Sequence, residues 1–381
     1  MRILHCCLSC FYIDNYNYQE NVLPRINREQ GHEVNIIAST ETFIDNKNLG
    51  YVEPLNYINE DGISVKRVAY KKIFPKFIMR KIRSYKNVYK LIEEYKPDVI
   101  LFHGAAAYEI INVAKYVKKN PNVKLYVDSH EDRNNSGTNW LSLNILHRLF
   151  YRWCNKIALK SVDKVFYLSE ETKEFLINIY KIPKVKLEFY PIGGTIFSFE
   201  ERLKNRNEKR LELNLSDKDI LLVHSGKMDK YKRTEDIVNA FCNINNNNLK
   251  LAIIGSFTED VRKVIDPLIS KNKRIFYLGW KDSSELSKYL CASDLYVQPG
   301  GQSATMQNAI CCGSPIAVYP HKSYKFFLNE NGYYIENVED MKKVFNDIVL
   351  HPEKIKIMSD NSLKFAHDVL DYEKIASRLY V

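Results

Sequence analysis

Residues 220–233 read ILLVHSGKMDKYKR, residues 249–256 read LKLAIIGS, and residues 295–303 read LYVQPGGQS. Each stretch begins with a short apolar run typical of a buried strand, and the small residues that follow each run predict a turn. The third turn opens a helical pattern that ends at Cys312-Gly313-Ser314-Pro315. A strand, a small-residue turn and a helix N-terminus together form an anion site. Two such turns and a pair of lysines in one half of the chain indicate a diphosphate ligand, and hence a nucleotide-sugar.

Strand and helix patterns alternate along the rest of the chain as well, which predicts parallel sheets with helices on both faces. The pattern loosens between Pro191 and Asn214, where two glycines precede a charged segment, and it restarts at Asp219. The chain therefore predicts an α/β fold of two doubly wound domains joined by a linker. Further strands are expected at residues 2–8, 33–38, 65–69, 99–102, 124–128, 164–168, 186–190, 274–278, 315–318 and 333–335. Helices are expected at residues 17–30, 73–95, 105–118, 141–160, 170–180 and 353–380.

Composition bounds the class of protein. The chain has 381 residues, 45% of them hydrophobic and 27% charged, which fits a globular protein of two domains. Cys6-Cys7 and Cys10 resemble part of a metal site, but no second Cys/His pair stands at zinc spacing, so no metal is expected. No run of 18 apolar residues predicts a membrane span, and no signal peptide is recognised. The cysteines lie mostly in apolar runs, so we expect a reducing, cytoplasmic location.

The net charge of +10 is concentrated between Lys66 and Lys96, where eleven basic residues face only Glu93 and Glu94. Aromatic and aliphatic residues recur among them at roughly helical spacing. A basic amphipathic helix would anchor the protein peripherally to an anionic surface such as the inner face of the plasma membrane. The alternative is a solvated basic face on a helix that packs on a sheet. Nucleic acid is a weaker third interpretation, because no binding motif accompanies the charge.

The segment Gly226–Arg233 carries the first candidate phosphate site. Lys227 and Lys232 flank a predicted helix start near Thr234, where two cations would neutralise a pyrophosphate and stabilise it as it leaves. Gly226 would let the backbone approach the ligand. The alternative is an ordinary basic surface turn.

The loop after Pro299 carries the second candidate site. Its glycines allow close backbone approach, and Ser303 is the predicted N-cap of the following helix. That leaves two backbone amides for phosphate oxygens, and helical spacing places Asn308 where it would hydrogen-bond ribose hydroxyls. The alternative is a glycine turn before a core helix. The predicted donor-binding residues are Gly226, Gly300, Gly301, Gln302, Ser303, Ala304, Thr305 and Asn308.

Polar residues after two strands of the first half indicate the opposite side of the site. His130 follows one strand and His103 follows the preceding one, and the carboxyl ends of parallel strands line a cleft. Either histidine is alternatively a structural residue, and Glu131 and Asp132 are alternatively helix caps. Tyr18, Gln19 and Glu20 occupy the first loop of the domain, so with His103 they are the acceptor-side candidates.

The chain as a whole resembles the GT-B glycosyltransferases of the large retaining family 4. No single motif is specific, but their order and spacing along nearly the full length are. The matching segments are Gly31–Val34, Pro97–Ile100 with His103, the strand before His130, Leu168–Glu171, Tyr190–Gly193, Gly226-Lys227 with Lys232, Ile254-Gly255, Leu278-Gly279, Ala292–Leu295 and Cys311–Pro315.

The resemblance implies two Rossmann-like domains facing each other across a cleft: an acceptor-side domain at residues 1–195, a linker at 196–214 and a donor domain at 215–360. A C-terminal helix at 361–381 would cross back to the first domain. It implies catalytic roles for His130 beside the donor sugar and for Lys227 and Lys232 at the phosphates. It also implies a UDP-linked donor sugar, a glycan or polyprenyl-linked acceptor, and transfer with retention in bacterial-type surface polysaccharide synthesis. No metal or other cofactor is implied, and no nucleic-acid partner.

Two departures from the family pattern keep other functions open. Asn308 stands where the family has the second of two glutamates, and the first has no fixed equivalent among Gly300, Gly301, Gln302 and Ser303. A non-catalytic sugar-nucleotide or glycan-binding protein and a nucleotide-sugar epimerase are therefore the alternatives. An epimerase would convert the donor with no acceptor present, and a binding protein would hold nucleotide without turnover.

Overall fold

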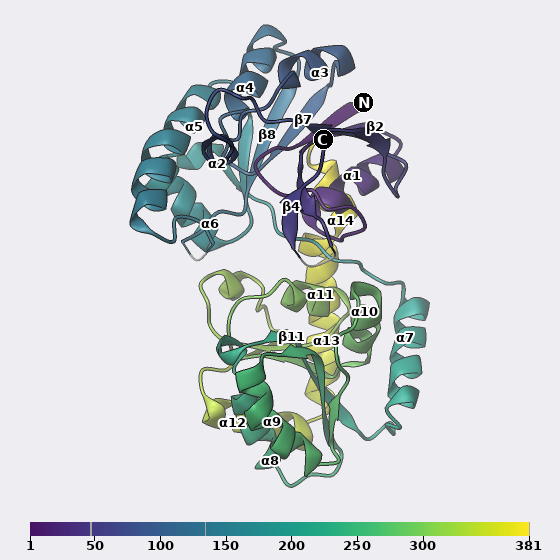
Figure 1. Ribbon diagram of the computed structural model, residues 1–381. Coiled ribbons are helices and arrows are strands. Elements are labelled where there is room, and N and C mark those ends of the chain that lie inside the picture. Colours follow the sequence, from purple (N-terminus) through teal and green to yellow (C-terminus); the bar gives the residue numbers. More distant parts are fainter. Residues whose placement is uncertain (46–47, 134, 381) are drawn as a thin grey trace. The chain divides into compact units, whose positions relative to one another are not determined.

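The computed structural model describes residues 1–45, 48–133 and 135–380. The chain divides into two compact units (Figure 1). Unit 1 comprises Met1–Pro191 together with the C-terminal residues from Tyr372, and unit 2 comprises Ile192–Asp371. Each unit is built on a mostly or wholly parallel sheet flanked by helices, as the alternating pattern predicts.

Unit 1 contains an eight-stranded sheet in the order β10-β9-β8-β7-β1-β2-β6-β5, in which only β5 runs antiparallel to its neighbour. A separate antiparallel pair joins β3 to β4. The strands are β1 (Arg2–Cys7), β2 (Glu33–Ser39), β3 (Glu41–Phe43), β4 (Leu49–Tyr51), β5 (Asn56–Ile58), β6 (Ser64–Val68), β7 (Val99–His103), β8 (Lys124–Ser129), β9 (Lys164–Tyr167) and β10 (Leu187–Phe189). The helices are α1 (Gln19–Glu29), α2 (Lys76–Ile82), α3 (Val88–Tyr95), α4 (Ile110–Lys119), η1 (Ser142–Tyr151), α5 (Arg152–Ala158), α6 (Glu170–Phe175), η2 (Leu176–Tyr180), η3 (Lys184–Lys186) and α14 (Tyr372–Ser377).

Two apolar layers cover the faces of this sheet. Side chains alternate along a strand, so Leu4 and Cys6 of β1 join the core that includes α3 and α4, while Ile3 and Cys7 join the core that includes α1 and α14. The C-terminal helix α14 is tied to this second layer by a hydrogen bond of 2.8 Å from Tyr190 Oη to the Ile375 carbonyl.

Unit 2 contains a six-stranded, wholly parallel sheet in the order β13-β12-β11-β14-β15-β16. The strands are β11 (Ile220–Met228), β12 (Leu249–Phe257), β13 (Ile275–Tyr277), β14 (Leu295–Gln298), β15 (Ile316–Val318) and β16 (Gly332–Tyr334). The helices are α7 (Phe199–Glu212), η4 (Lys230–Lys232), α8 (Thr234–Cys242), α9 (Glu259–Ser270), α10 (Ser283–Ala292), α11 (Thr305–Cys311), η5 (Ser323–Phe326), α12 (Val338–Leu350), α13 (Glu353–Phe365) and η6 (Ala366–Leu370).

Both sheets reverse their winding direction once. In unit 1 the chain moves outward from β1 through β2 and then returns to place β7 on the other side of β1. In unit 2 the same reversal separates β11 from β14. Ligands of open α/β sheets bind at such a switch point, outside the carboxyl ends of the strands. A binding site is therefore expected at the residues that follow β1, β7, β11 and β14.

The predicted linker at residues 196–214 is a helix of unit 2. A capping box formed by Ser198 and Glu201 starts α7, and Arg206 and Arg210 reach Asp294 at 2.7 and 3.0 Å. Two of the charges that suggested a linker are therefore used in ion pairs with Asp294, which directly precedes β14. The predicted boundary between 360 and 361 falls inside α13, and the segment that joins unit 1 begins at Tyr372; Val381 lies outside the described residues.

The single basic helix predicted at residues 73–95 is two short helices, α2 and α3. Arg83 and Asn87 adopt left-handed backbone angles, with φ of 54° and 61°, and a continuous helix cannot pass through such residues. Within the described part of the chain, no helix combines the length and the apolar character needed to cross a bilayer.

Candidate functional site

The switch point of unit 2 is formed by a tight turn after β11. The Asp229 carboxylate accepts hydrogen bonds from the amides of Tyr231 and Lys232, at 2.9 and 3.2 Å, and so fixes the short helix η4. The chain then enters α8 through Arg233, which has left-handed backbone angles. This turn directs the Lys232 side chain toward the loop that follows β14.

Gly300 and Gly301 interlock with that turn. A Cβ atom on Gly300 would lie 2.1 Å from the Tyr231 carbonyl oxygen, so only glycine fits there. The Gly301 amide donates to the same oxygen at 3.0 Å, and Lys232 Nζ donates to the Gly301 carbonyl at 3.4 Å. Two chain segments that are 70 residues apart thereby form one wall around the lysine amine.

Three further side chains hold the loop that follows β14 by contacts with its backbone. Gln298 donates to the Gly301 carbonyl at 2.6 Å, and the Tyr324 hydroxyl accepts from the Ser303 amide at 2.7 Å. His321 Nε2 lies 3.1 Å from the Gly300 carbonyl. None of these three residues was predicted from the sequence to belong to the site. The only signal for Gln298 was an amide side chain at the end of an apolar strand.

Lys232 is the cation that this wall surrounds. Burial lowers the pKa of its amine below the ordinary lysine value, and the nearby Asp229 carboxylate offsets only part of that effect. A Cβ atom on Gly226 would lie 3.6 Å from Lys232 Cε, so the glycine leaves the face of the lysine open. A partly desolvated amine beside glycine backbone suits an anionic ligand that brings its own negative charge.

The switch point of unit 1 is built from ionisable side chains instead. His103, the last residue of β7, places Nδ1 2.6 Å from the Asp128 carboxylate of β8 and Nε2 3.0 Å from His5 Nδ1 of β1. His5 Nε2 lies 3.0 Å from Asn27 Oδ1. All four side chains are buried.

The hydrogen bonds determine which ring nitrogens of His5 and His103 carry protons. Burial alone would lower the pKa of His103, but the Asp128 carboxylate outweighs it and raises that pKa to about 10. Burial and the positive His103 ring lower the pKa of His5 to about 3. His103 is therefore an imidazolium that donates from both nitrogens, and His5 is neutral and donates to Asn27.

His130 lies at the end of this chain of contacts. Its Nε2 atom is 3.8 Å from a carboxylate oxygen of Asp128 and 3.8 Å from one of Glu20, which begins α1. No described residue accepts or donates a hydrogen bond at that atom, and the same holds for both amide atoms of the buried Gln19. Unpaired polar groups at the carboxyl edge of the sheet indicate a place where a hydroxyl-bearing ligand is recognised.

Comparison with known proteins identifies the family. A family model described as glycosyl transferases group 1 matches residues 205–365, and one described as Glycosyltransferase Family 4 matches residues 26–193. The first model covers the switch point of unit 2, and the second covers β7 and β8 of unit 1 but not β1.

The chain is a group 1 glycosyltransferase with the GT-B fold.

Individual relatives are distant. An uncharacterized glycosyltransferase of Methanocaldococcus jannaschii is 24% identical over 257 residues, which span 62% of this chain and 64% of that protein. A glycosyltransferase from Rickettsia africae superposes with a TM-score of 0.70 at 15% identity, covering 99% of this chain and 96% of its own. Sucrose-phosphate synthase from Thermosynechococcus elongatus gives 0.67 at 15% identity, with coverages of 99% and 96%. The Anabaena protein HepE, solved with UDP, gives 0.65 at 12% identity, with coverages of 99% and 98%, and it is also solved with UDP-glucose.

Two predicted features of the donor side of this glycosyltransferase are wrong in detail. Ser225–Lys227 and Gly255-Ser256 are not turns, because β11 and β12 stay paired through Gly226 opposite Gly255 and Lys227 opposite Ser256. A Cβ atom on Gly255 would lie 1.8 Å from the Gly226 carbonyl oxygen, so the two glycines permit this close pairing. Lys227 is exposed on the extended strand.

The helix after the glycine loop begins later than predicted. The cap position of α11 is Ala304 and not Ser303, and the Thr305 amide donates to Ser303 Oγ at 3.3 Å, so it is already occupied. Gln302 is used to hold the loop, through a 2.8 Å hydrogen bond to Ser323 Oγ. Asn308 is partly exposed on α11, where its Oδ1 atom would lie 3.1 Å from a Cβ on Gly194.

The acceptor-side candidates separate into two groups. Glu20 and His103 belong to the contacts around His130, whereas Tyr18 is exposed before α1 with its ring 5.2 Å from that of Tyr16. Glu131 does not cap a helix. It accepts from the Ala105 amide at 3.0 Å and from the Ser129 hydroxyl.

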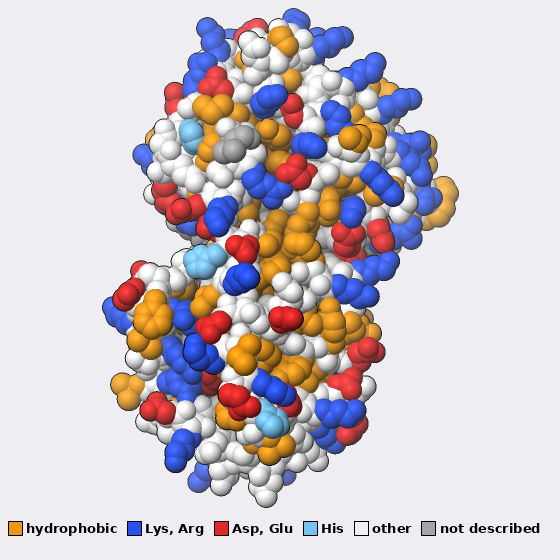
Figure 2. Space-filling model, turned by 180° about the vertical axis from the view of Figure 1, so that it is seen from behind, with side chains coloured by type: hydrophobic (Ala, Val, Ile, Leu, Met, Phe, Trp, Pro, Cys, Tyr) orange, Lys and Arg blue, Asp and Glu red, His pale blue; other side chains and the backbone are white. Residues whose placement is uncertain are grey.

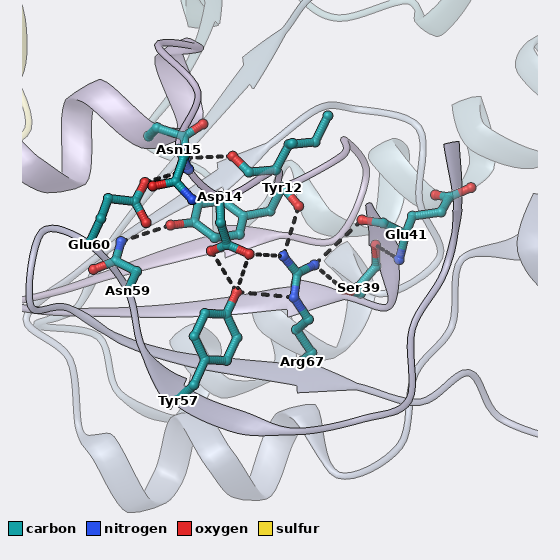
Figure 3. Close-up of polar contacts among 11 residues, drawn as sticks. Tyr12, Asp14, Asn15, Ser39, Glu41, Tyr57, Asn59, Glu60 and Arg67 are labelled. Atoms are coloured by element: carbon teal, nitrogen blue, oxygen red, sulfur yellow. Dashed lines mark hydrogen bonds and ion pairs between the residues drawn. The ribbon is translucent and has the colours of Figure 1, made fainter. Parts of the chain in front are cut away.

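Arg67 shows that part of the basic segment of this glycosyltransferase is structural (Figure 3). Its buried guanidinium contacts Asp14 Oδ2 at 2.9 Å, the Tyr57 hydroxyl at 3.1 Å, and the carbonyls of Tyr12 and Ser39 at 3.0 and 3.1 Å. The fork geometry of arginine suits this convergence of acceptors. Arg67 lies on β6 and joins two loops at the carboxyl edge of the sheet, so it does not belong to a surface helix.

Proposed function

We propose that this glycosyltransferase transfers a sugar from a UDP-linked donor to a glycan or polyprenyl-linked acceptor, with retention and without a metal ion, in the synthesis of a bacterial-type surface polysaccharide. The observation that carries the donor proposal is the wall of Gly226, Gly300 and Gly301 around Lys232 at the switch point of unit 2. The complexes of Anabaena HepE with UDP and UDP-glucose support the choice of nucleotide.

The proposed chemistry assigns one task to each unit. The Lys232 amine, together with Lys227 on β11, neutralises the diphosphate as the bond to the sugar breaks, which is the largest electrostatic demand of the reaction. Lysine serves here as a point charge, the part that a metal ion plays elsewhere. In the described part of the chain, no three His, Cys, Asp or Glu side chains are grouped so as to hold a metal ion.

His130 is proposed to contact the donor sugar from unit 1. Its Nε2 atom lies 3.8 Å from carboxylate oxygens of both Asp128 and Glu20, and Asp128 is itself fixed by the His103 imidazolium. Gln19 and Glu20 offer an amide and a carboxylate to sugar or acceptor hydroxyls. Asn308 is proposed to bind the ribose diol in place of a glutamate, with a weaker, uncharged hydrogen bond.

The test is the Lys232→Ala variant beside Lys230→Ala, which removes an exposed amine from the same turn. Loss of a preorganised charge contact lowers kcat/KM by roughly 10²–10³-fold, so Lys232→Ala should fall by that amount while Lys230→Ala stays close to the parent. UDP should raise the melting temperature of the parent and of Lys230→Ala, but not of Lys232→Ala. Equal effects in the two variants would contradict the assignment of Lys232.

Three further readouts decide the remaining parts of the proposal. Product anomers measured by NMR report retention, and turnover that is unchanged in EDTA reports metal independence. Incubation of UDP-glucose without acceptor separates transfer from epimerisation. UDP binding with no turnover on any acceptor would favour the binding-protein alternative that Asn308 keeps open.

A further inference from the structure

One helical segment of unit 1 packs only one of its faces against the core. The π-helical η1 continues directly into α5, and its inner face buries His147, Tyr151, Cys154, Asn155 and Ala158. Asn155 donates to the Ala105 carbonyl at 2.8 Å, and His147 Nδ1 lies 2.8 Å from the Tyr180 hydroxyl. This face anchors the segment firmly, so its opposite face has a defined position on the surface.

The opposite face is apolar and open to solvent. Residues four apart lie on one side of a helix, and five positions from 141 to 157 repeat at that spacing with Leu, Ile or Trp at each one. The exposed large side chains are Trp140 (69%), Leu141 (67%), Ile145 (48%), Leu149 (63%), Trp153 (49%) and Ile157 (41%). Isolated exposed apolar residues are ordinary, whereas a continuous row indicates a surface with a partner.

A basic row runs beside the apolar row. Arg148, Arg152, Lys156 and Lys160 are all exposed and also recur every four residues. Between Asn139 and Ser161 the chain contains no Asp or Glu. Lys and Arg side chains are also more frequent than Asp and Glu on the face of unit 1 seen in Figure 2.

The chemistry of these two rows fits a lipid surface better than a second copy of the chain. Tryptophan prefers the interface between headgroups and acyl chains, and Leu and Ile prefer the acyl region below it. Arg and Lys side chains at the depth of the headgroups attract anionic lipids. A symmetric dimer through this face would set one basic row against another, and like charges in contact repel.

We propose that the outer face of η1 and α5, at residues 140–160, binds the surface of an anionic lipid bilayer without crossing it. This surface differs from the basic segment Lys66–Lys96, in which Arg67 is buried in the sheet and the helix is interrupted. The inference does not rest on the proposed sugar-transfer reaction, because the binding is measured without donor or acceptor.

The three tryptophans provide an internal probe, since Trp140 and Trp153 lie in the proposed surface and Trp280 is an exposed residue of unit 2. In the Trp280→Phe protein, vesicles of phosphatidylglycerol and phosphatidylcholine should shift the emission to the blue. Brominated phosphatidylcholine should then quench it by about twofold, because an interfacial indole reaches the acyl boundary. In the Trp140→Phe/Trp153→Phe protein, the emission of Trp280 should not change. Equal responses of the two proteins, or no response, would overturn the proposal.

Vesicle sedimentation measures the contribution of each row. Leu149→Ser/Trp153→Ser removes apolar contact, and Arg148→Glu/Arg152→Glu reverses charge. Each should weaken binding at least about tenfold, given the usual value of buried apolar area and of basic residues near anionic lipid. Leu211→Ser/Leu350→Ser, at exposed positions of unit 2, is the matched control and should bind like the parent.

A third variant separates this surface from the Lys66–Lys96 segment. Lys72→Glu/Lys76→Glu changes exposed residues of that segment and should leave most of the binding in place. If it abolishes binding while the η1–α5 variants retain it, the proposed location is wrong. If the parent does not sediment with anionic vesicles and instead forms a dimer that Leu149→Ser/Trp153→Ser dissociates, the occupant is a second copy of the chain. Circular dichroism confirms that each variant is folded.

Discussion

The switch points of the two units occupy equivalent places in sheets of the same winding, but different kinds of residue form them. In unit 2, glycine backbone surrounds one partly buried lysine, so the site offers room beside a single positive charge. In unit 1, a buried chain runs from Asn27 through His5 and His103 to Asp128, so the charges are already compensated inside the protein. The same topology can therefore serve two purposes. It can provide an uncompensated positive charge for an anionic ligand, or it can position a histidine for an uncharged ligand.

The largest effect should come from breaking the internal compensation in unit 1. Asp128→Asn leaves the buried His103 without its counter-charge, and breaking a buried ion pair costs about 3–5 kcal/mol of unfolding free energy. Denaturant unfolding of the parent and the variant measures the difference. Glu170→Gln removes a partly exposed pairing with Lys173, and a pair near the surface contributes about 0–1 kcal/mol, so it is the control. If Asp128→Asn is no worse than Glu170→Gln, the compensated character of unit 1 is refuted.

The second effect should come from filling the space in unit 2. Gly300→Ala puts a methyl group against the Tyr231 carbonyl and displaces the loop, whereas a Cβ on Gly301 meets no atom within 4 Å. A displacement of this size costs about a hundredfold in productive binding, so UDP affinity measured by calorimetry should fall by that factor in Gly300→Ala. Gly301→Ala should bind UDP nearly as tightly as the parent. Similar losses in both would mean that the loop does not depend on this close contact.

The third effect is the pH dependence that the histidines of unit 1 impose. Between pH 6.5 and about 10 the folded His103 keeps a proton that the unfolded chain releases, so its contribution is complete below 6.5 and is lost as the pH rises through about 10. His5 is neutral when folded, with a pKa of about 3, so its contribution is complete above 6.5 and is lost as the pH falls. Each one-proton difference changes the unfolding free energy by about 1.4 kcal/mol per pH unit.

The opposite pH dependences of His103 and His5 together predict a maximum of stability near neutral pH. Unfolding curves measured from pH 5 to 9 test it, with Asp128→Asn as the comparison. Without the carboxylate, His103 has no reason to hold its proton at alkaline pH, so the alkaline decline should flatten. A decline of the same slope in parent and variant would assign it to other groups.

The smallest effect concerns the single charge of unit 2. Burial lowers the pKa of Lys232, so free protein loses this proton at a lower pH than an ordinary lysine would. In the proposed function UDP binds the protonated amine, and its affinity should therefore decline a few-fold as the pH rises toward 10. Lys232→Arg stays charged throughout that range, so its affinity should be flatter even if it is weaker at neutral pH. Parallel pH profiles would show that Lys232 is not the titrating group.

Sequence patterns predicted most of the strands because buried parallel strands are short, apolar and bounded by small residues. They predicted the helix start near Thr234, where α8 begins, and a single helix over 353–380, which the structure divides into α13, η6 and α14. They did not predict the break between α2 and α3, because the left-handed angles of Arg83 and Asn87 leave no mark in apolar periodicity. The charged segment of α7 was predicted to be a linker. The sequence could not show that these charges pair with Asp294, because Asp294 lies more than 80 residues away.

The candidate site divides in the same way. Lys232, Gly300, Gly301, His103 and His130 were identified from the sequence, since each follows a predicted strand where cleft residues belong. Gln298, His321 and Tyr324 were not, because their role is to contact a loop that is remote in sequence. His5, Asn27 and Asp128 were missed as a network for the same reason.

The sequence by itself determined the α/β alternation, the order of the elements and the residue types at the strand ends, because these depend on neighbours within a few positions. Only the tertiary structure decided which strand ends meet, which cation is partly buried and which is exposed, and where the protons of the buried histidines reside. Those properties depend on distance and desolvation between segments far apart in the chain. The contrast between Lys227 and Lys232, five residues apart and alike in sequence, shows the difference most directly.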